Sequence, residues 1–522
     1  MQEKSFEIFV IIFIILVNSY LIAIVMKKNF TFLLVLIALK IYSQSLNIDF
    51  SFGNSGFVLI PETSEIAHFD YDQGGNIICV GYTMLPLGVS RLTLARTNVN
   101  GQLDQSFGNN GVVKTQLDEK EFPYGLLIQN DSKIIVCGSI SGSTGRYGFV
   151  IRYNTDGTID QSFATNGVFK TSTIGSVIFS VTKLSDDKIL LDVEKDSGTT
   201  LMKLTKNGVI DQTFGNNGEL VLSDTNFNFF SQDSPIVLSD SKILFVGTEN
   251  SDLENAKIAY CKIDEHGNFD TTFGQNGKMT LDIYNNQPYV TEYLFNAKEN
   301  TDKKITVNGN IGGEGIVVRI NQDGTLDTTF GNNGIVDSFY PANRKIEVQP
   351  DGKVILGKNK DMSNYNVGYS LERLQNNGIQ DLSFNNNVGH FDIDYSSGQD
   401  YLQDMKLQSQ TKLLVAGSAK NTNGVSNFAL VRVDLNNDLS VQDSREVSAI
   451  SVYPNPVKNL ININTKEQIV SYEIYDINAN KILFKQQNDI KQIDVSALPI
   501  GNYILKLKTL SEEKNFKIIK SN

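Results

Sequence analysis

A short motif that recurs along most of the chain is the feature that most constrains its fold. The motif reads D-x-[ST]-F-G-x-N-G, and its clear copies begin at Asp104, Asp211, Asp270 and Asp327. Weaker copies begin at Asp49, Asp160 and Asp381. The motif phenylalanines lie 51 to 59 residues apart, at Phe52, Phe107, Phe163, Phe214, Phe273, Phe330 and Phe384. Such a period indicates a repeat architecture in which each unit packs against its neighbours.

Each repeat unit has the apolar runs and turn residues of β-strands. In one unit the sequence predicts strands at 112–115, 124–129, 133–138 and 149–153, joined by short turns rich in Asp, Asn and Gly. Four strands in a unit of about 40 to 60 residues are typical of a β-propeller blade, whereas helical repeats need a 3.6-residue period that is missing. We therefore predict an all-β fold, with a seven-bladed β-propeller of four-stranded blades over residues 44–440.

The repeat register also predicts how the ring closes. Six units have an aspartate three residues after the turn that follows the fourth predicted strand, but the seventh has Ser440. A spare motif lies near the start of the chain, at Asp49–Gly53. We predict that this copy completes the last blade and places Phe52 beside the blade of Arg432, because closure removes exposed sheet edges.

A basic residue in the fourth predicted strand recurs with the motif aspartate. We expect these charged residues to pin the turn and the phenylalanine to pack between blades. The residues assigned to this structural role are Asp104, Phe107, Arg152, Asp160, Asp211, Phe214, Asp270, Phe273, Arg319, Asp327 and Phe330. The alternative is a calcium loop at Asn154, Asp156 and Asp160, although Thr205 and Asn207 replace the first two in the next unit.

Cysteine, histidine and charge exclude several classes of function. The three cysteines are far apart, so they form no readable disulfide framework or zinc knuckle, and the three histidines show no HExxH pattern. The net charge of −12 opposes binding to a phosphate backbone, so no nucleic-acid partner is expected. We predict no metal, no cofactor and no catalytic residues.

The repeat resembles a known family. Its units, together with the downstream D-G-K-[IV]-[IL]-x-x-G pattern at Asp351–Gly357, resemble the delta-60 repeat family of bacterial secreted β-propellers over residues 46–440. The third unit departs from the pattern, with Val193 at the position of the strand-three glycine. The resemblance implies an extracellular propeller and carries no catalytic residues over to this chain.

The N-terminal region predicts export. Residues 26–43 have a basic start at Lys27 and Lys28 and an apolar run at 30–39, which together indicate a signal peptide. A second apolar run lies upstream, within residues 1–25. Either translation starts at Met26 and residues 1–25 are an extension, or they form an extra apolar segment that anchors the chain in a membrane.

A different module follows the repeats. After a polar linker at 441–449, residues 450–522 alternate apolar and polar side chains, which predicts a small antiparallel β-sandwich. This tail resembles the type A C-terminal sorting domain of type IX secretion cargo, through Tyr453, Pro454, Asn455, Pro456, Gly501 and Tyr503. The resemblance implies Sec export, recognition by the type IX secretion machinery, and a protein that is released or held at the cell surface.

For the propeller we expect a binding or scaffold role with a glycan or protein ligand. Loops between the first and second and between the third and fourth predicted strands vary, and such loops are the usual place for binding residues. The candidate ligand-face aromatics are Phe227, Phe229, Phe230, Tyr284 and Tyr365. The alternative is a polysaccharide-degrading enzyme, which needs a base or carboxylate pair unique to one blade; Glu292, Glu347 and Glu372 show no such pattern.

Overall fold

The computed structural model describes residues 48–521 except for seventeen short segments, and it divides the chain into two compact units, Met1–Asn437 and Asp438–Asn522. The segments left out are 196–197, 224–228, 232–233, 250–256, 284–291, 312–313, 342–344, 362–366, 386–388, 396–399, 421–423, 436–449, 454–456, 466–467, 477–480, 488–489 and 510–512. Within the described residues no helix is long and apolar enough to cross a membrane.

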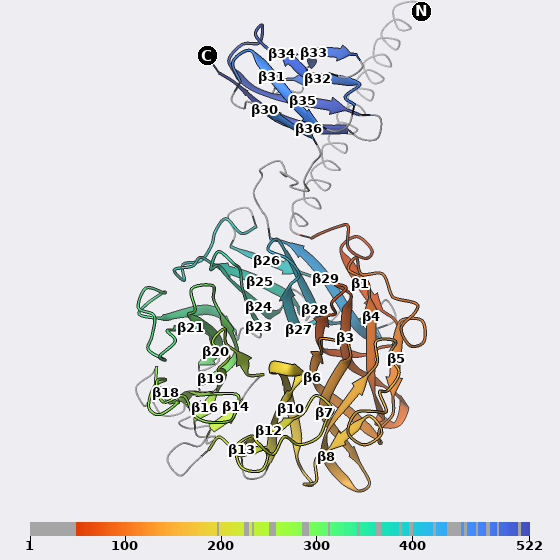
Figure 1. The fold of residues 1–522 in the computed structure, drawn as a ribbon, viewed down its shortest axis with the longest axis vertical. Coiled ribbons are helices and arrows are strands. Elements are labelled where there is room, and N and C mark those ends of the chain that lie inside the picture. Colours follow the sequence, from red (N-terminus) through yellow and green to blue (C-terminus); the bar gives the residue numbers. More distant parts are fainter. Residues whose placement is uncertain are drawn as a thin grey trace, which may run out of the picture. The chain divides into compact units, whose positions relative to one another are not determined.

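Seven antiparallel sheets make up the described part of the first unit and surround a common centre (Figure 1). The first three are β2 (Glu65–Tyr71), β3 (Ile77–Met84), β4 (Ser90–Thr97) and β5 (Val112–Thr115); β6 (Lys120–Ile128), β7 (Ile134–Gly142), β8 (Gly145–Tyr153) and β9 (Val168–Lys170); and β10 (Val177–Lys183), β11 (Ile189–Lys195), β12 (Gly198–Leu204) and β13 (Glu219–Val221). Short 3-10 turns lie at Pro86–Gly88 and Ser185–Asp187.

The next three sheets repeat this plan with one variation. They are β14 (Phe229–Ser231), β15 (Ile236–Val237), β16 (Ile243–Glu249), β17 (Lys257–Ile263) and β18 (Lys278–Leu281); β19 (Glu292–Glu299), β20 (Ile305–Ile311), β21 (Glu314–Ile320) and β22 (Ile335–Pro341); and β23 (Lys345–Val348), β24 (Val354–Asp361), β25 (Val367–Leu374) and β26 (His390–Ile393). In the first of them, β14 and β15 both pair with β16. The all-β architecture of four-stranded antiparallel sheets is confirmed.

The last sheet joins the two ends of the first unit. It combines β27 (Tyr401–Leu407), β28 (Lys412–Lys420) and β29 (Ser426–Asp434) with β1 (Phe57–Ile60), in the order β1-β29-β28-β27. Strand β1 is antiparallel to β29, with Phe57 opposite Val431 and Ile60 opposite Phe428. The N-terminal segment therefore supplies the outer strand of the last sheet, as the closure argument predicts.

Sheet boundaries differ from the predicted repeat units by one strand. The strand after the motif, β5, pairs with β4 and is the outer strand of the preceding sheet, not the first strand of the next. The reason is that each sheet begins at its inner strand, after the variable loop, whereas the repeated motif lies between the third and fourth strands of a sheet. Each loop still lies on the face of the propeller that we predicted. Shifting the strand numbering by one changes the numbers of the two strands that a loop joins, but not the end of those strands at which the loop lies.

Apolar side chains fill the space between neighbouring sheets. Middle strands such as β7 are buried along seven consecutive residues because both of their faces are covered. One hydrophobic cluster joins the last sheet to the first, with Phe428 and Leu414 packing against Phe69 and Cys79. All three cysteines are buried free thiols, so they act as small apolar side chains.

The second unit has its own core. A three-stranded sheet contains β30 (Ile450–Tyr453), β31 (Leu460–Thr465) and β34 (Gln492–Asp494); a four-stranded sheet contains β32 (Ser471–Tyr475), β33 (Lys481–Gln486), β35 (Gly501–Lys508) and β36 (Glu513–Lys520). Ile461 and Ile463 from the first sheet and Ile474 and Leu505 from the second belong to one buried cluster. This is the predicted small antiparallel sandwich.

Candidate functional site

The repeated charged residues form a clamp between adjacent sheets. Arg152 on β8 contacts Asp160 of its own sheet, with 2.8 Å between Nε and Oδ2, and donates from Nη1 to the backbone oxygen of Lys206 in the next sheet at 2.6 Å. Its guanidinium carbon lies 4.8 Å from the centre of the Phe163 ring. One side chain thus joins a motif, an aromatic ring and the neighbouring turn.

The same contact recurs in all seven sheets, in most of them through arginine. The nitrogen–oxygen distances of the pairs are 2.8 Å for Arg96–Asp104, 2.8 Å for Arg152–Asp160, 3.9 Å for Lys203–Asp211, 3.4 Å for Lys262–Asp270, 2.7 Å for Arg319–Asp327, 2.8 Å for Arg373–Asp381 and 2.8 Å for Arg432–Asp49. The two lysine pairs are the longest, since lysine lacks the planar fork of arginine.

The motif phenylalanines fill the junctions between sheets. All seven are fully buried: Phe52, Phe107, Phe163, Phe214, Phe273, Phe330 and Phe384. The turn glycine of the next sheet lies against the ring; a Cβ on Gly208, for example, would lie 2.7 Å from the Phe163 ring. Gly208 also has a φ of 81°, which side-chain-bearing residues rarely adopt. These positions repeat because each one serves the packing of sheet on sheet.

Hydrogen bonds hold the motif aspartates in their ionised form. Burial alone would raise the pKa of Asp49, but hydrogen bonds from Ser51 and Lys412 outweigh it and lower the pKa to about 2. The pKa values of the other six motif aspartates are lowered as well, at Asp104, Asp160, Asp211, Asp270, Asp327 and Asp381. Negative charge at these positions therefore stabilises the fold.

Protein donors already occupy the oxygens considered as calcium ligands. Asp160 accepts hydrogen bonds from Arg152, Lys133 and Ser162, and Asp156 accepts two from Thr158 in a local turn. Among the residues that the structure describes, no group of three or more His, Cys, Asp and Glu side chains is placed to hold a metal ion.

The predicted ligand-face aromatics do not form a described surface. Phe227, Tyr284 and Tyr365 lie outside the described residues, as does the side chain of Phe230. Phe229 is 0% exposed and packs in a cluster with Phe245. Phe229 is thus a core residue and cannot contact a ligand there, because its alternation along β14 directs it inward.

In the sorting domain, Pro454, Asn455 and Pro456 also fall outside the described residues, whereas Tyr453 ends β30 and Gly501 begins β35. The Tyr503 hydroxyl donates to the backbone oxygen of Pro499 at 2.8 Å, which fixes the turn before β35.

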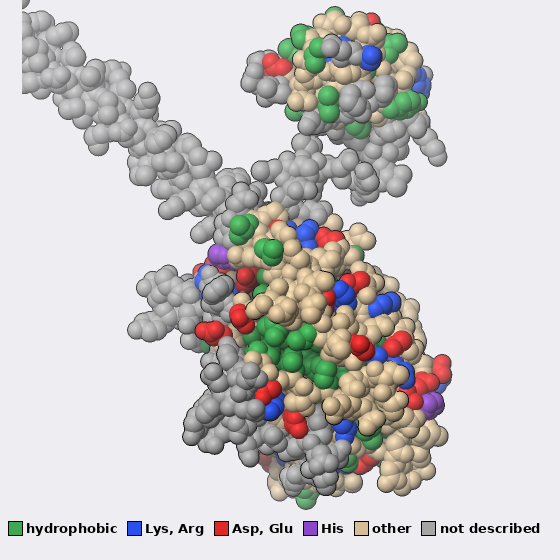
Figure 2. All heavy atoms as spheres, turned by 90° about the vertical axis from the view of Figure 1, so that its left-hand side faces the viewer, with side chains coloured by type: hydrophobic (Ala, Val, Ile, Leu, Met, Phe, Trp, Pro, Cys, Tyr) green, Lys and Arg blue, Asp and Glu red, His purple; other side chains and the backbone are tan. Residues whose placement is uncertain are grey.

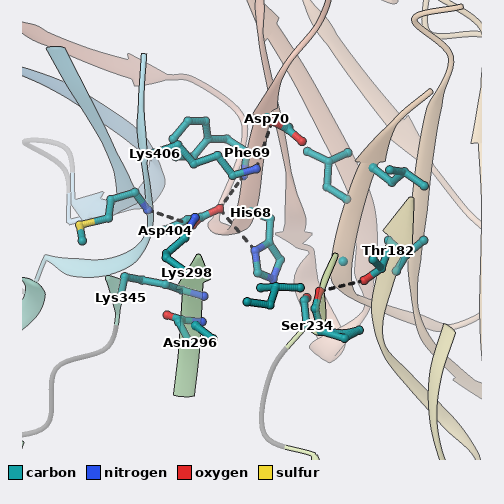
Figure 3. A pocket seen from close by; sticks show the side chains of 18 of the residues that line it. His68, Phe69, Asp70, Thr182, Ser234, Asn296, Lys298, Lys345, Asp404 and Lys406 are labelled. Atoms are coloured by element: carbon teal, nitrogen blue, oxygen red, sulfur yellow. Dashed lines mark hydrogen bonds and ion pairs between the residues drawn. The ribbon is translucent and has the colours of Figure 1, made fainter. Parts of the chain in front are cut away.

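A pocket of about 280 Å³ lies where the inner strands of the seven sheets meet (Figure 3). Its charged and histidine lining comes from β2, β10, β19, β23 and β27, with two or three neighbouring residues contributed by most strands. These residues are His68, Asp70, Lys183, Lys298, Lys345, Asp404 and Lys406. None belongs to the repeated motif, so each strand contributes different chemistry to one cavity.

Irregular strand pairing sets the direction of some of these side chains. In β2, β6, β10, β19 and β27 the register with the next strand slips at one residue, directly before His68, Gly125, Ser180, Asn296 and Asp404. Such bulges bend a strand and change the direction of its side chains. They place His68 and Asp404, from the first and last sheets, on the same side of the pocket.

His68 and Asp404 form a largely buried contact in the pocket. The distance between His68 Nδ1 and Asp404 Oδ2 is 3.4 Å, and Asp404 also accepts hydrogen bonds from the backbone of Phe69 and Met405. Burial acts to raise the pKa of Asp404, but His68 and the charges of Lys345 and Lys406 outweigh it and hold the pKa well below its usual value. Asp404 therefore stays ionised and is held by its contact with His68 and by the charges of the neighbouring lysines.

Two further ion pairs join neighbouring sheets across the pocket. Lys298 Nζ lies 2.6 Å from Glu347 Oε1, and Lys406 Nζ lies 3.1 Å from Asp70 Oδ1. Burial would lower the pKa of Lys298, but Glu347 outweighs it, so the pKa is raised and the lysine remains charged. Sequence reasoning missed His68 and set Glu347 aside; the only available signal was that neither follows the repeat.

The outer surface is mixed in charge. On the side of the molecule turned to the viewer in Figure 2, acidic and basic side chains of the first unit are interspersed around a small hydrophobic area.

Comparisons with known proteins identify both parts of the chain. Residues 451–521 match the family model described as secretion system C-terminal sorting domain. Residues 75–107, 129–163, 301–330 and 412–439 match the model described as domain of unknown function (DUF5122) beta-propeller. A search of curated proteins found no match.

A search of solved structures found similar chains at low identity and low TM-score. A catalytically inactive virginiamycin B lyase from Staphylococcus aureus is 12% identical, with 72% of this chain and 97% of that chain covered and a TM-score of 0.43. A protein of unknown function from Dyadobacter fermentans is 11% identical, with 73% and 98% covered and a TM-score of 0.40. A polysaccharide lyase acting on ulvan is 9% identical, with 72% and 87% covered and a TM-score of 0.41. The chain is a β-propeller followed by a type IX secretion sorting domain, and it is exported to the cell surface or released.

Proposed function

We propose that the propeller is a non-enzymatic binding module that works outside the cell. The observation that carries this proposal is the central pocket, to which the inner strands contribute unrepeated polar side chains. The repeated charges, by contrast, are engaged in clamps between sheets, as Arg152 is with Asp160 and Lys206. A concave site with a few converging polar groups is the usual form of a ligand site.

The expected ligand is a glycan or a protein at the cell surface. The pocket and the variable loops offer separate places to recognise it, and a rigid ring that carries variable loops is a common arrangement for recognition. Phe227, Phe230, Tyr284 and Tyr365 remain candidates for contact with the ligand.

The test asks whether a ligand retains the protein and whether the protein cleaves that ligand. The exported protein, purified from cells that secrete it, is passed over immobilised acidic and neutral polysaccharides and surface proteins, and the same samples are analysed for cleavage products. Retention of at least one ligand without products is the expected result. Failure to retain any ligand, or formation of products at a rate that depends on protein concentration, overturns the proposal.

A polysaccharide-degrading enzyme is the second candidate, and the His68–Asp404 contact is the observation that favours it. A histidine beside a carboxylate has the composition of a general base with its positioning partner. If products form in the assay above, His68→Gln is expected to abolish them under the enzyme hypothesis. Products that persist in His68→Gln would place the activity elsewhere.

A further inference from the structure

The central pocket differs in charge from the rest of the chain. Lys183, Lys298, Lys345 and Lys406 line it, against the carboxylates of Asp70 and Asp404, and Glu347 adds a third carboxylate behind Lys298. Lysines thus outnumber carboxylates at the pocket even with Glu347 included, while the whole chain has a net charge of −12. A local excess of positive charge in a concave site attracts anions.

Nitrogen-bearing side chains are also the more accessible members of two of the pairs. The Lys298 side chain is 37% exposed and its partner Glu347 is 9% exposed. His68 is 24% exposed and Asp404 is 8% exposed. In these two pairs the carboxylate is the more buried partner and holds the nitrogen-bearing side chain in place, whereas Lys406 and Asp70 are about equally exposed, at 30% and 32%.

Three of the four lysines lie in one sector of the wall. Lys298, Lys345 and Lys406 come from the inner strands of three successive sheets, β19, β23 and β27, and Figure 3 shows them near His68 and Asp404. Another part of the wall is apolar, with Leu127 and Val181 from β6 and β10 and Ile236 from β15, beside the polar Thr182, Lys183 and Ser234. The pocket therefore offers charged donors in one sector and an apolar patch in another.

We propose that this sector binds the oxyanion of a small organic molecule, a carboxylate or a sulfate group carried by a ring-sized body. Lys298, Lys345 and Lys406 hold the oxyanion, and the apolar wall contacts the ring. The volume of about 280 Å³ is at the lower end of ligand sites and suits one charged sugar or the end of a chain. A uronic acid and a sulfated sugar are the two sources of this chemistry. The inference rests on the proposed binding function and adds its site and ligand class.

The experiment titrates the full exported protein with glucuronate, glucose 6-sulfate and glucose, and follows the heat of binding at low and high salt. One or both anions are expected to bind, more weakly at high salt, while glucose does not bind. Binding of glucuronate alone assigns the carboxylate, and binding of glucose 6-sulfate alone assigns the sulfate. Equal binding of glucose, or no binding of either anion, overturns the pocket proposal.

Matched variants locate the site. Lys345→Gln is expected to weaken anion binding at least about tenfold, because a charge-assisted hydrogen bond is lost. Lys170→Gln, an exposed lysine on the outer strand β9, serves as the control and is expected to bind like the wild type. If Lys345→Gln does not fold, Lys406→Gln replaces it. Wild-type affinity in a folded Lys345→Gln or Lys406→Gln overturns the site.

The two proposals fail differently. If neither anion binds but the protein is still retained on a polysaccharide or surface protein, the pocket site is wrong and the binding function stands. If nothing is retained and nothing binds, both are wrong.

Discussion

Arg152 shows how a single residue links the sequence repeat to the packing of the sheets. Its guanidinium reaches Asp160, the carbonyl oxygen of Lys206 in the next sheet, and the face of Phe163. Five sheets use arginine at this position, and two use lysine, Lys203 and Lys262, with longer contacts to the aspartate. The planar fork of arginine serves several acceptors at once, which a single ammonium group does less well.

Replacing this arginine tests the clamp. Arg152→Ala is expected to lower the free energy of unfolding by about 1 to 3 kcal/mol, because Asp160 keeps its 2.8 Å contact with Lys133 and is not left unpaired. Arg146→Ala, an exposed change on the same strand, is the control and should shift it by less than about 0.5 kcal/mol. Urea unfolding followed by circular dichroism measures both. An equal effect of the two substitutions would show that the clamp contributes nothing.

The motif aspartates predict loss of stability in acid. Their pKa values are lowered in the folded protein, to about 2 for Asp49 and Asp211 against an ordinary 3.8, so the unfolded chain takes up protons first. Their contribution is complete above about pH 4 and is lost as the pH falls toward 2. The urea midpoint should therefore fall steeply between pH 4 and pH 2, and less steeply in Asp160→Asn. A midpoint independent of pH in this range contradicts the account.

The element that closes the ring is the short strand β1, which pairs with β29, about 370 residues further along the chain. In the motif that precedes β1, Asp49 contacts Arg432, with 2.8 Å between Oδ2 and Nε. Phe52 of the same motif packs in the core between the last and first sheets. In the closed ring the short β1 covers the edge of the longer β29, which would otherwise end the last sheet. Ordering the N-terminal segment is thus coupled to the whole propeller.

Removing the closing strand is expected to destabilise the ring. Deletion of residues 48–60 removes β1, Asp49 and Phe52, and should lower the melting temperature of the first unit markedly, because a paired strand and a buried ring are lost. If the deletion does not fold, Ile60→Ala, at a 1% exposed position, should cost about 2 to 4 kcal/mol, and the exposed Leu59→Ala should cost less than about 1 kcal/mol. A melting temperature unchanged by either deletion or Ile60→Ala would refute closure through β1.

The repeat made most of the fold predictable, because Phe107 and Asp160 each have one packing role that recurs in all seven units, and Gly157 has one that recurs in six. Sheet boundaries were less predictable, since the sequence period runs from motif to motif while β5 pairs backward onto β4. The pocket could not be predicted. His68 and Asp404 are unrepeated, lie 336 residues apart and meet through bulges that leave no signature in the sequence. At Phe229 the prediction was wrong: we expected a variable loop, whereas the residue lies buried in strand β14.

At the scale of the whole molecule, the two units have separate cores and separate tasks. The second unit buries its own cluster around Ile474 and Leu505, and it carries the sorting domain that directs export. Separate cores are expected to fold separately. The sorting domain and the propeller can therefore be separated by experiment.

Deleting residues 449–522 should stop export without unfolding the propeller. The truncated protein is expected to accumulate in the periplasm with the melting temperature that the first unit has in the intact chain. Cell fractionation and thermal unfolding of the isolated protein measure the two results, and the intact chain in the same cells is the control. Truncated protein found in the medium or on the cell surface would contradict the role of the tail.

The central claim is that the inner strands bind the ligand and the repeated turns hold the sheets together. Hydrogen–deuterium exchange of the exported protein, measured with and without a ligand that binds it, tests this claim most directly. The account predicts slower exchange in the inner strands that line the pocket, above all β2, β19, β23 and β27, with unchanged exchange in the motif turns such as Phe107–Gly111. Slower exchange in the motif turns, with the inner strands unchanged, would contradict it.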